Sequence, residues 1–145
     1  MNEIEINGNS LPDLLTTAIE DGTWPPPIDS AKAISPPVED TKYFSFLSVT
    51  RMIQETESLR NLLERGYDSI YGLTNGEEYK TGLLNVDCAV VIAVSHSEDI
   101  VVLDYSVNTS PRVVAIQDGD AGLKWVEVAE NFDAFLKKLK RHNSS

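Results

Sequence analysis

The sequence predicts a single α+β domain of 145 residues, in which helices pack around an antiparallel β-sheet of four to six strands. Three observations lead to this prediction. Residues 88–94 form an unbroken apolar run, the two connections that follow it are short, and three other segments have apolar residues at helical spacing. A chain of this length is usual for one domain and buries about two thirds of its unfolded surface, so it needs neither metal nor disulfide to fold.

The first helix is predicted at residues 11–20. Ser10 is a candidate N-cap, Pro12 suits a first helical turn, and Asp13 lies near the positive end of the helix dipole. Gly22 is suited to end the helix. Its apolar residues recur at intervals of three and four, and they are Leu11, Leu14, Leu15, Ala18 and Ile19.

A proline-rich connector is expected at about residues 24–37, because consecutive prolines exclude a helix interior. Trp24 flanks it and is expected to be buried. The second helix is predicted at residues 48–65, with Ser48 as its N-cap and Gly66 just past its end. Its apolar stripe comprises Val49, Met52, Ile53, Thr56, Leu59, Leu62 and Leu63.

The segment from residue 67 to residue 85 mixes glycines with polar residues. Asn75 and Gly76 form the dipeptide that most favours a two-residue hairpin turn, and the apolar residues before them allow a short strand.

The sheet is predicted on residues 88–128. Because residues 88–94 are apolar at every position, that strand must be covered on both faces. The five residues that follow are too few for a parallel crossover, so residues 100–105 return antiparallel, and the same argument applies to residues 113–116. The last strand is predicted at residues 125–128, with Val126 and Val128 on one face and Trp125 and Glu127 on the other.

The closing helix is predicted at residues 131–140, with Asn131 as its cap. Phe132, Phe135, Leu136 and Leu139 fall at helical spacing, and the two phenylalanines should be largely buried together with Trp125. Four basic residues lie near its C-terminal end, where the helix dipole favours cations: Lys137, Lys138, Lys140 and Arg141.

The composition is strongly acidic, with 23 acidic and 12 basic residues and a net charge of −11. Such a field repels nucleic acid and anionic membranes and accelerates encounter with a basic partner, although acidic surfaces also serve solubility alone. The first twenty residues lack the pattern of a signal peptide, and no apolar run is long enough to span a membrane. Cys88 is the single cysteine, which excludes an internal disulfide and suggests the cytoplasm.

Catalytic and metal-binding patterns fail on inspection. His96 lies beside Ser95 and Ser97, but adjacent loop residues cannot form a catalytic triad. The acidic segment that begins at Asp118 fails as a calcium loop at three positions: Gly122 stands where an oxygen ligand is needed, Leu123 where glycine is needed, and Ala129 where a bidentate glutamate is needed. Cys88, His96 and His142 are the only cysteine and histidines, and because they are scattered over a strand, a loop and the C-terminal tail, no zinc site is expected. We therefore expect no enzyme activity, no cofactor and no metal.

Several segments resemble the SUKH superfamily, which includes bacterial toxin-immunity proteins and yeast cell-wall-synthesis regulators. They are the Leu103-Asp104-Tyr105-Ser106 segment, Pro111 before an apolar strand, Trp125 in a short strand, and the Val128-Ala129-x-Asn131-Phe132-x-x-Phe135 helix start. The Leu11-Pro12 helix entry and residues 46–53 are similar as well, so the resemblance covers about residues 11–139. The short segment before Leu11 and the proline-rich connector depart from the family pattern.

The resemblance implies a small cytoplasmic protein that binds and neutralises a secreted toxin, often a nucleic-acid-modifying enzyme, and it offers no catalytic motif. A basic toxin would suit an acidic inhibitor. A regulatory scaffold of the cell-wall type and a small enzyme with an unfamiliar site are the alternatives; regulatory relatives usually carry long disordered flanks. The expected partner-binding residues are the acidic ones in the connections around the central strands: Glu98, Asp99, Asp104, Asp118 and Asp120.

Overall fold

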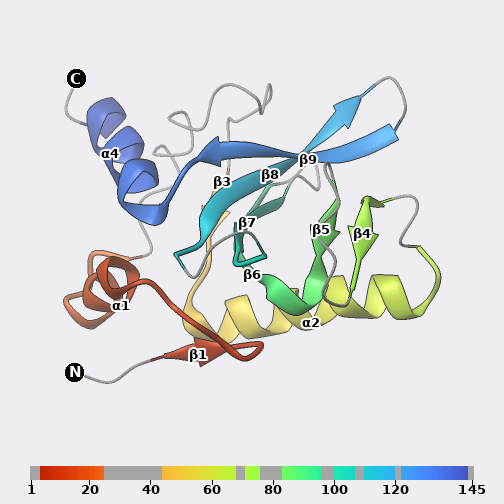
Figure 1. Cartoon of the computed structure of the whole chain (residues 1–145). Helices are drawn as coiled ribbons and strands as arrows, with labels where there is room; N and C mark the ends of the chain where they lie inside the picture. The colour runs from red at the N-terminus through yellow and green to blue at the C-terminus, as the bar shows by residue number, and fades with distance from the viewer. Residues whose placement is uncertain are drawn as a thin grey trace.

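A five-stranded antiparallel sheet forms the centre of the protein, with the strand order β3-β6-β7-β8-β9 (Figure 1). The predicted α+β class and antiparallel sheet are therefore confirmed. The computed structural model describes residues 4–24, 44–67, 71–75, 83–95, 100–106, 110–119 and 122–143. The five strands are β3 (Phe44–Phe46), β6 (Ala89–Ser95), β7 (Ile100–Asp104), β8 (Arg112–Gly119) and β9 (Gly122–Ala129).

Strand β6 is buried on both faces, as its unbroken apolar sequence predicted. Ala89 to Ala93 are each at most 1% exposed. The strand begins at Ala89 because Cys88 belongs to a short 3-10 helix, η2 (Val86–Cys88). Its pairing with β7 shifts between Val91 and Ala93, which leaves Ile92 as a bulge residue.

Two backbone groups at this bulge form hydrogen bonds with residues outside β6 and β7. The backbone N–H of Val91 donates to the hydroxyl of Thr56 at 3.0 Å, and the carbonyl of Ile92 accepts from the N–H of Leu47 at 2.9 Å. Thr56 lies on helix α2 (Val49–Glu64) and is 2% exposed. This explains why a polar residue occupies the apolar stripe predicted for that helix.

Helix α2 packs against β6 on one face of the sheet (Figure 1). Its predicted ends are confirmed: the Ser48 hydroxyl accepts from the N–H of Arg51 at 3.4 Å, and Gly66 adopts a φ of +88°. Ile53 was assigned to the apolar stripe but is 41% exposed.

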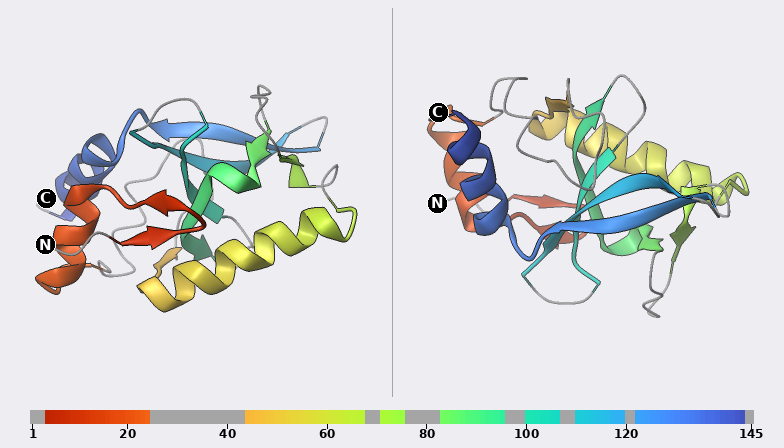
Figure 2. Two further views of the ribbon diagram at one scale, coloured as in Figure 1. Left: turned by 60° about the horizontal axis from the view of Figure 1, so that its bottom comes forward. Right: turned by 90° about the horizontal axis from the view of Figure 1, so that it is seen from above.

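Helices α1 (Asp13–Glu20) and α4 (Phe132–Asn143) lie side by side at one end of the sheet (Figures 1 and 2). The predicted cap of α4 is confirmed, because the Asn131 side-chain oxygen accepts from the N–H of Ala134 at 2.8 Å. The predicted cap of α1 is wrong. Pro12 occupies that position without a side-chain hydrogen bond, and Ser10 instead pairs with Glu5 in a β-hairpin.

This N-terminal hairpin was not predicted. Strands β1 (Glu5–Ile6) and β2 (Asn9–Ser10) are joined by Asn7 and Gly8, whose φ angles are +57° and +77°. Two successive positive φ values are what a two-residue type I′ turn requires, and Asn-Gly is its most favoured sequence.

The second Asn-Gly dipeptide, Asn75-Gly76, follows a strand that pairs in parallel with its partner. Strand β4 (Leu73–Thr74) pairs in parallel with β5 (Leu84–Asn85), forming a separate two-stranded sheet. A hairpin at Asn75 and Gly76 would give β4 an antiparallel partner, whereas its partner β5 is parallel. Gly76 itself lies outside the described residues.

Strands β8 and β9 are longer than predicted, because their pairing continues through the acidic segment to Gly119 and Gly122. A second bulge, between Val113 and Val114, leaves Val128 as the extra residue of β9. The predicted alternation of β9 is consequently interrupted: Trp125 and Val128 are both buried, although they were assigned to opposite faces.

Four aromatic rings connect α4 to the edge of the sheet. Trp24 lies edge-on to Phe46 and Phe132, with ring centroids 5.3 Å and 5.8 Å apart, and its indole N–H donates to the carbonyl of Leu47 at 2.8 Å. Phe135 completes the cluster. The predicted burial of Trp24, Trp125, Phe132 and Phe135 is confirmed. Residues 25–37 of the predicted connector lie outside the described residues.

Replacing Phe135 with alanine should therefore be costly. The side chain is fully buried, and we expect the free energy of unfolding to fall by about 3 to 5 kcal/mol in a urea titration. Leu14→Ala is the control, because Leu14 is 46% exposed, and it should cost less than about 0.5 kcal/mol. Similar losses for the two variants would contradict the assigned core.

Candidate binding surfaces

Two of the expected acidic connections begin and end at the same end of the sheet. Strand β6 ends where β7 begins, with Val94 opposite Ile100, and β8 ends where β9 begins, with Gly119 opposite Gly122. The β7–β8 register, with Val101 opposite Ala115, brings both sets of strand ends to one side. The strand ends that the two acidic connections join therefore lie at a common end of the sheet, which we call the loop end.

Four of the five expected binding residues lie, in the sequence, between these strand ends or next to them. Glu98, Asp99 and Asp120 lie outside the described residues. Asp118 is within β8, opposite Leu123, and not in a loop as expected.

Asp104 is the exception, and its assignment to an exposed acidic surface is wrong. It lies at the other end of β7 and is 1% exposed. One carboxylate oxygen accepts from the N–H and the hydroxyl of Ser106 at 2.9 Å and 2.6 Å, and the other accepts from Arg112 Nε at 2.9 Å. A carboxylate with these partners holds the β7–β8 connection together and is not available to another protein.

The next residue of the same sequence segment, Tyr105, is also structural. Its hydroxyl donates to the carbonyl of Ser10 at 2.7 Å, and its N–H donates to the carbonyl of Cys88 at 2.8 Å. Burial raises the pKa of the Tyr105 phenol. The residue thus ties the N-terminal hairpin and helix η2 to the end of β7.

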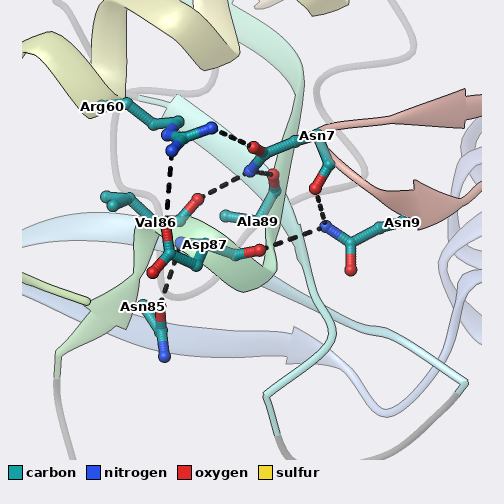
Figure 3. Close-up of polar contacts among 7 residues, drawn as sticks. All are labelled: Asn7, Asn9, Arg60, Asn85, Val86, Asp87 and Ala89. Atoms are coloured by element: carbon teal, nitrogen blue, oxygen red, sulfur yellow. Dashed lines mark hydrogen bonds and ion pairs between the residues drawn. The ribbon is translucent and has the colours of Figure 1, made fainter. Parts of the chain in front are cut away.

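A polar cluster fixes the turn of that hairpin against α2 and η2 (Figure 3). The Asn7 amide donates to the carbonyls of Val86 and Ala89 at 2.7 Å and 3.1 Å, and its oxygen accepts from Arg60 at 2.7 Å. Arg60 also lies 3.6 Å from a carboxylate oxygen of Asp87. These contacts join segments about eighty residues apart in the sequence.

A groove lies between the starting turns of α1 and α4. These two helices lie at the end of the molecule opposite the end where β8 and β9 meet (Figure 1). The groove has a volume of about 470 Å³. Leu14 and the carboxylates of Asp13 and Asp133 line it and are exposed, while buried Leu11, Pro111 and Phe132 complete its apolar lining. Sequence reasoning missed this surface because it assigned Leu14 to the core side of the helix.

Within the described residues, no group of three or more His, Cys, Asp or Glu side chains could hold a metal ion. Burial raises the pKa of the Cys88 thiol, and the negative charges of Asp104 and Asp87 raise it further, which makes a poor nucleophile. A second cavity of about 300 Å³ lies between α2 and Val91 of β6, where its acidic residue, Glu55, is already paired with Arg51.

Comparison with protein-family models, with curated proteins and with solved structures finds no match to this chain. Across the part of the chain that the structure describes, no helix is both long and apolar enough to cross a membrane.

Replacing Arg112 should lower the free energy of unfolding, because it leaves the buried Asp104 carboxylate without its cationic partner. Asp104 is 2% exposed in its side chain, so we expect Arg112→Ala to lower the free energy of unfolding by about 3 kcal/mol. The matched control is Lys137→Ala, which breaks the exposed pair with Asp133 and should cost about 0.5 kcal/mol or less. Equal losses in urea titrations would show that the Asp104 pair is not a structural bond.

Tyr105→Phe tests the link to the hairpin. At neutral pH the lost hydrogen bond should cost about 1 kcal/mol. Because burial favours the neutral phenol, its contribution is complete below the ordinary tyrosine pKa of about 10 and is lost as the pH rises above it. The variant should therefore lose less stability than the wild type between about pH 8 and about pH 11. Tyr67→Phe, at an exposed position, should behave like the wild type, and an alkaline loss equal to the wild type in the Tyr105 variant would refute the link.

Proposed function

We propose that the protein is a non-enzymatic immunity protein that neutralises a basic, nucleic-acid-targeting toxin by direct binding through an acidic surface. The observation that carries the proposal is the net charge of −11, together with a strand order in which the strand ends joined by two acidic connections lie at one end of the sheet. The similarity of the Leu103 to Ser106 segment, Trp125 and the Phe132/Phe135 helix to SUKH immunity proteins supports it.

The proposed mechanism is electrostatic attraction between the two proteins. A toxin that acts on nucleic acid must attract phosphates, so its active surface is basic, and an acidic protein is drawn to the same surface. Once bound, the inhibitor excludes the substrate without any chemical step. Steering of this kind acts mainly on the association rate.

The contact residues that we propose at the loop end are Glu98, Asp99, Asp118 and Asp120. We further propose that the protein acts in the cytoplasm, since a single cysteine fits a reducing compartment. Asp104 is not included, because it is buried and paired with Arg112.

The first test uses the protein as bait in a lysate of its own organism, followed by co-expression. A retained basic polypeptide that is toxic alone and harmless together with this protein is the expected result. A retained partner that is acidic, or toxicity that persists on co-expression, would refute the proposed function.

The loop end is tested by Asp118→Lys/Asp120→Lys. We expect association with the retained polypeptide to slow by about tenfold or more, with little change in dissociation or melting temperature. Glu57→Lys/Glu64→Lys on the exposed face of α2 makes the same change in net charge and is the control. If both double variants slow association equally, or if association is insensitive to salt, the loop end is not the steering surface.

A further inference from the structure

The turn of the N-terminal hairpin consists of an asparagine followed by a glycine, the dipeptide in which deamidation meets the least steric hindrance. In this reaction the backbone nitrogen of Gly8 attacks the side-chain amide carbon of Asn7, and ammonia leaves as a five-membered succinimide ring closes. Water then opens the ring at either carbonyl, which yields aspartate or isoaspartate. Water is the only co-reactant, and the turn itself supplies the nucleophile and the amide.

Gly8 lies at an open position of the turn. It is exposed, and Asn7 is partly exposed. Within the part of the chain that the structure describes, nothing beyond the adjoining residues lies within 4 Å of the place that a Cβ of Gly8 would take. Crowding around the turn therefore does not prevent the reaction.

The conformation of the folded turn does prevent it. Asn7 has a φ of +57° and Gly8 a φ of +77°, as a type I′ turn requires. In the left-handed conformation ψ is about +47°, which places Cβ nearly anti to the backbone nitrogen of the next residue. In the succinimide, Cβ and this nitrogen lie on the same side of the Cα–C bond. Asn7 must therefore leave the turn conformation before the ring can close.

Hydrogen bonds hold the Asn7 side chain in the same unreactive arrangement (Figure 3). The amide nitrogen, which is the leaving group, donates to the carbonyls of Val86 and Ala89 at 2.7 Å and 3.1 Å. The amide oxygen accepts from Arg60 at 2.7 Å. The same contacts attach the hairpin to η2 and α2, so the rotation that deamidation needs requires local opening of the hairpin.

We propose that Asn7 is a deamidation site whose rate is limited by opening of the N-terminal hairpin, and that the reaction weakens the attachment of the hairpin to η2. An ionised aspartate only accepts hydrogen bonds. Arg60 can bind the new carboxylate, but the carbonyls of Val86 and Ala89 lose their donor.

The isoaspartate product disturbs the hairpin in a second way. It adds a methylene group to the backbone of the turn, which joins Ile6 to its partner Asn9. Both products form irreversibly, so the modification accumulates in molecules whose hairpin has opened. The proposal needs no partner protein and is independent of the proposed function.

The role of opening is tested by mass spectrometry of the full chain kept at neutral pH, with peptide mapping of each deamidated site. We expect deamidation of Asn7 to be about tenfold or more slower in the folded chain than in the chain unfolded in urea, because the rate follows the open population. Asn75-Gly76 is the internal reference, and in urea both dipeptides should react at similar rates. Equal rates at Asn7 with and without urea, or no reaction at Asn7 in urea, would refute the proposal.

A matched pair of variants connects the rate with the hydrogen bonds. Arg60→Ala removes a charged donor to Asn7 and should accelerate deamidation there by about fivefold or more. Arg51→Ala removes another exposed arginine of α2, one that pairs with Glu55, and should leave the rate at Asn7 unchanged. Melting temperatures of both variants establish that the fold is intact. Equal rates at Asn7 in the two variants would contradict protection by this cluster.

The effect of the reaction is tested with Asn7→Asp, which carries the aspartate product. The N–H of Leu11 donates to the carbonyl of Ile4 at 2.8 Å next to the hairpin, and its exchange with deuterium should become about tenfold faster. Exchange at Val91 in β6 should not change. Asn61→Asp, at an exposed position of α2, adds the same charge and is the control. Unchanged exchange at Leu11 in Asn7→Asp, or an equal increase in the control, would show that deamidation does not loosen the hairpin.

Discussion

The fold depends on covering both faces of β6. Its residues from Ala89 to Ala93 are almost completely buried, so other elements must pack above and below a strand that has no polar face. Helix α2 packs against this strand, and Thr56 within α2 satisfies the N–H of Val91 next to the bulge. The apolar requirement of one strand thus determines where the second helix lies and why a threonine occurs in its stripe.

A second constraint acts at the end of β7. Asp104 and Tyr105 are consecutive, yet they stabilise different parts of the structure: Asp104 binds Arg112 and Ser106, and Tyr105 binds Ser10 of the N-terminal hairpin. Both sets of contacts lie within the protein, so these two side chains have a structural role in the fold.

Much of the fold could be predicted from the sequence because local signals agreed with the tertiary structure. The apolar run before Ser95, the Ser48 cap and the Asn131 cap all act through adjacent residues, and each was found. The bulges at Ile92 and Val128 depend on the register between strands, which no local pattern reveals. Ser10 has the composition of a cap, but pairing with Glu5 across the Asn7-Gly8 turn decided its place.

The candidate surfaces were less predictable for a related reason. Whether a carboxylate is exposed depends on how neighbouring strands pair, as the contact of Asp104 on β7 with Arg112 on β8 demonstrates. Exposure of Leu14 likewise follows from how α1 lies beside α4, since helical spacing alone assigns it to the core.

We propose that this protein acts by binding and not by catalysis. The most direct measurement is the activity of the retained basic polypeptide on nucleic acid as this protein is added in increasing amounts. We expect inhibition to rise linearly and to be complete at an equimolar ratio, with the polypeptide recovered chemically unchanged after separation. Complete inactivation at a small fraction of an equivalent, with a covalent change in the polypeptide, would show turnover and contradict inhibition by binding.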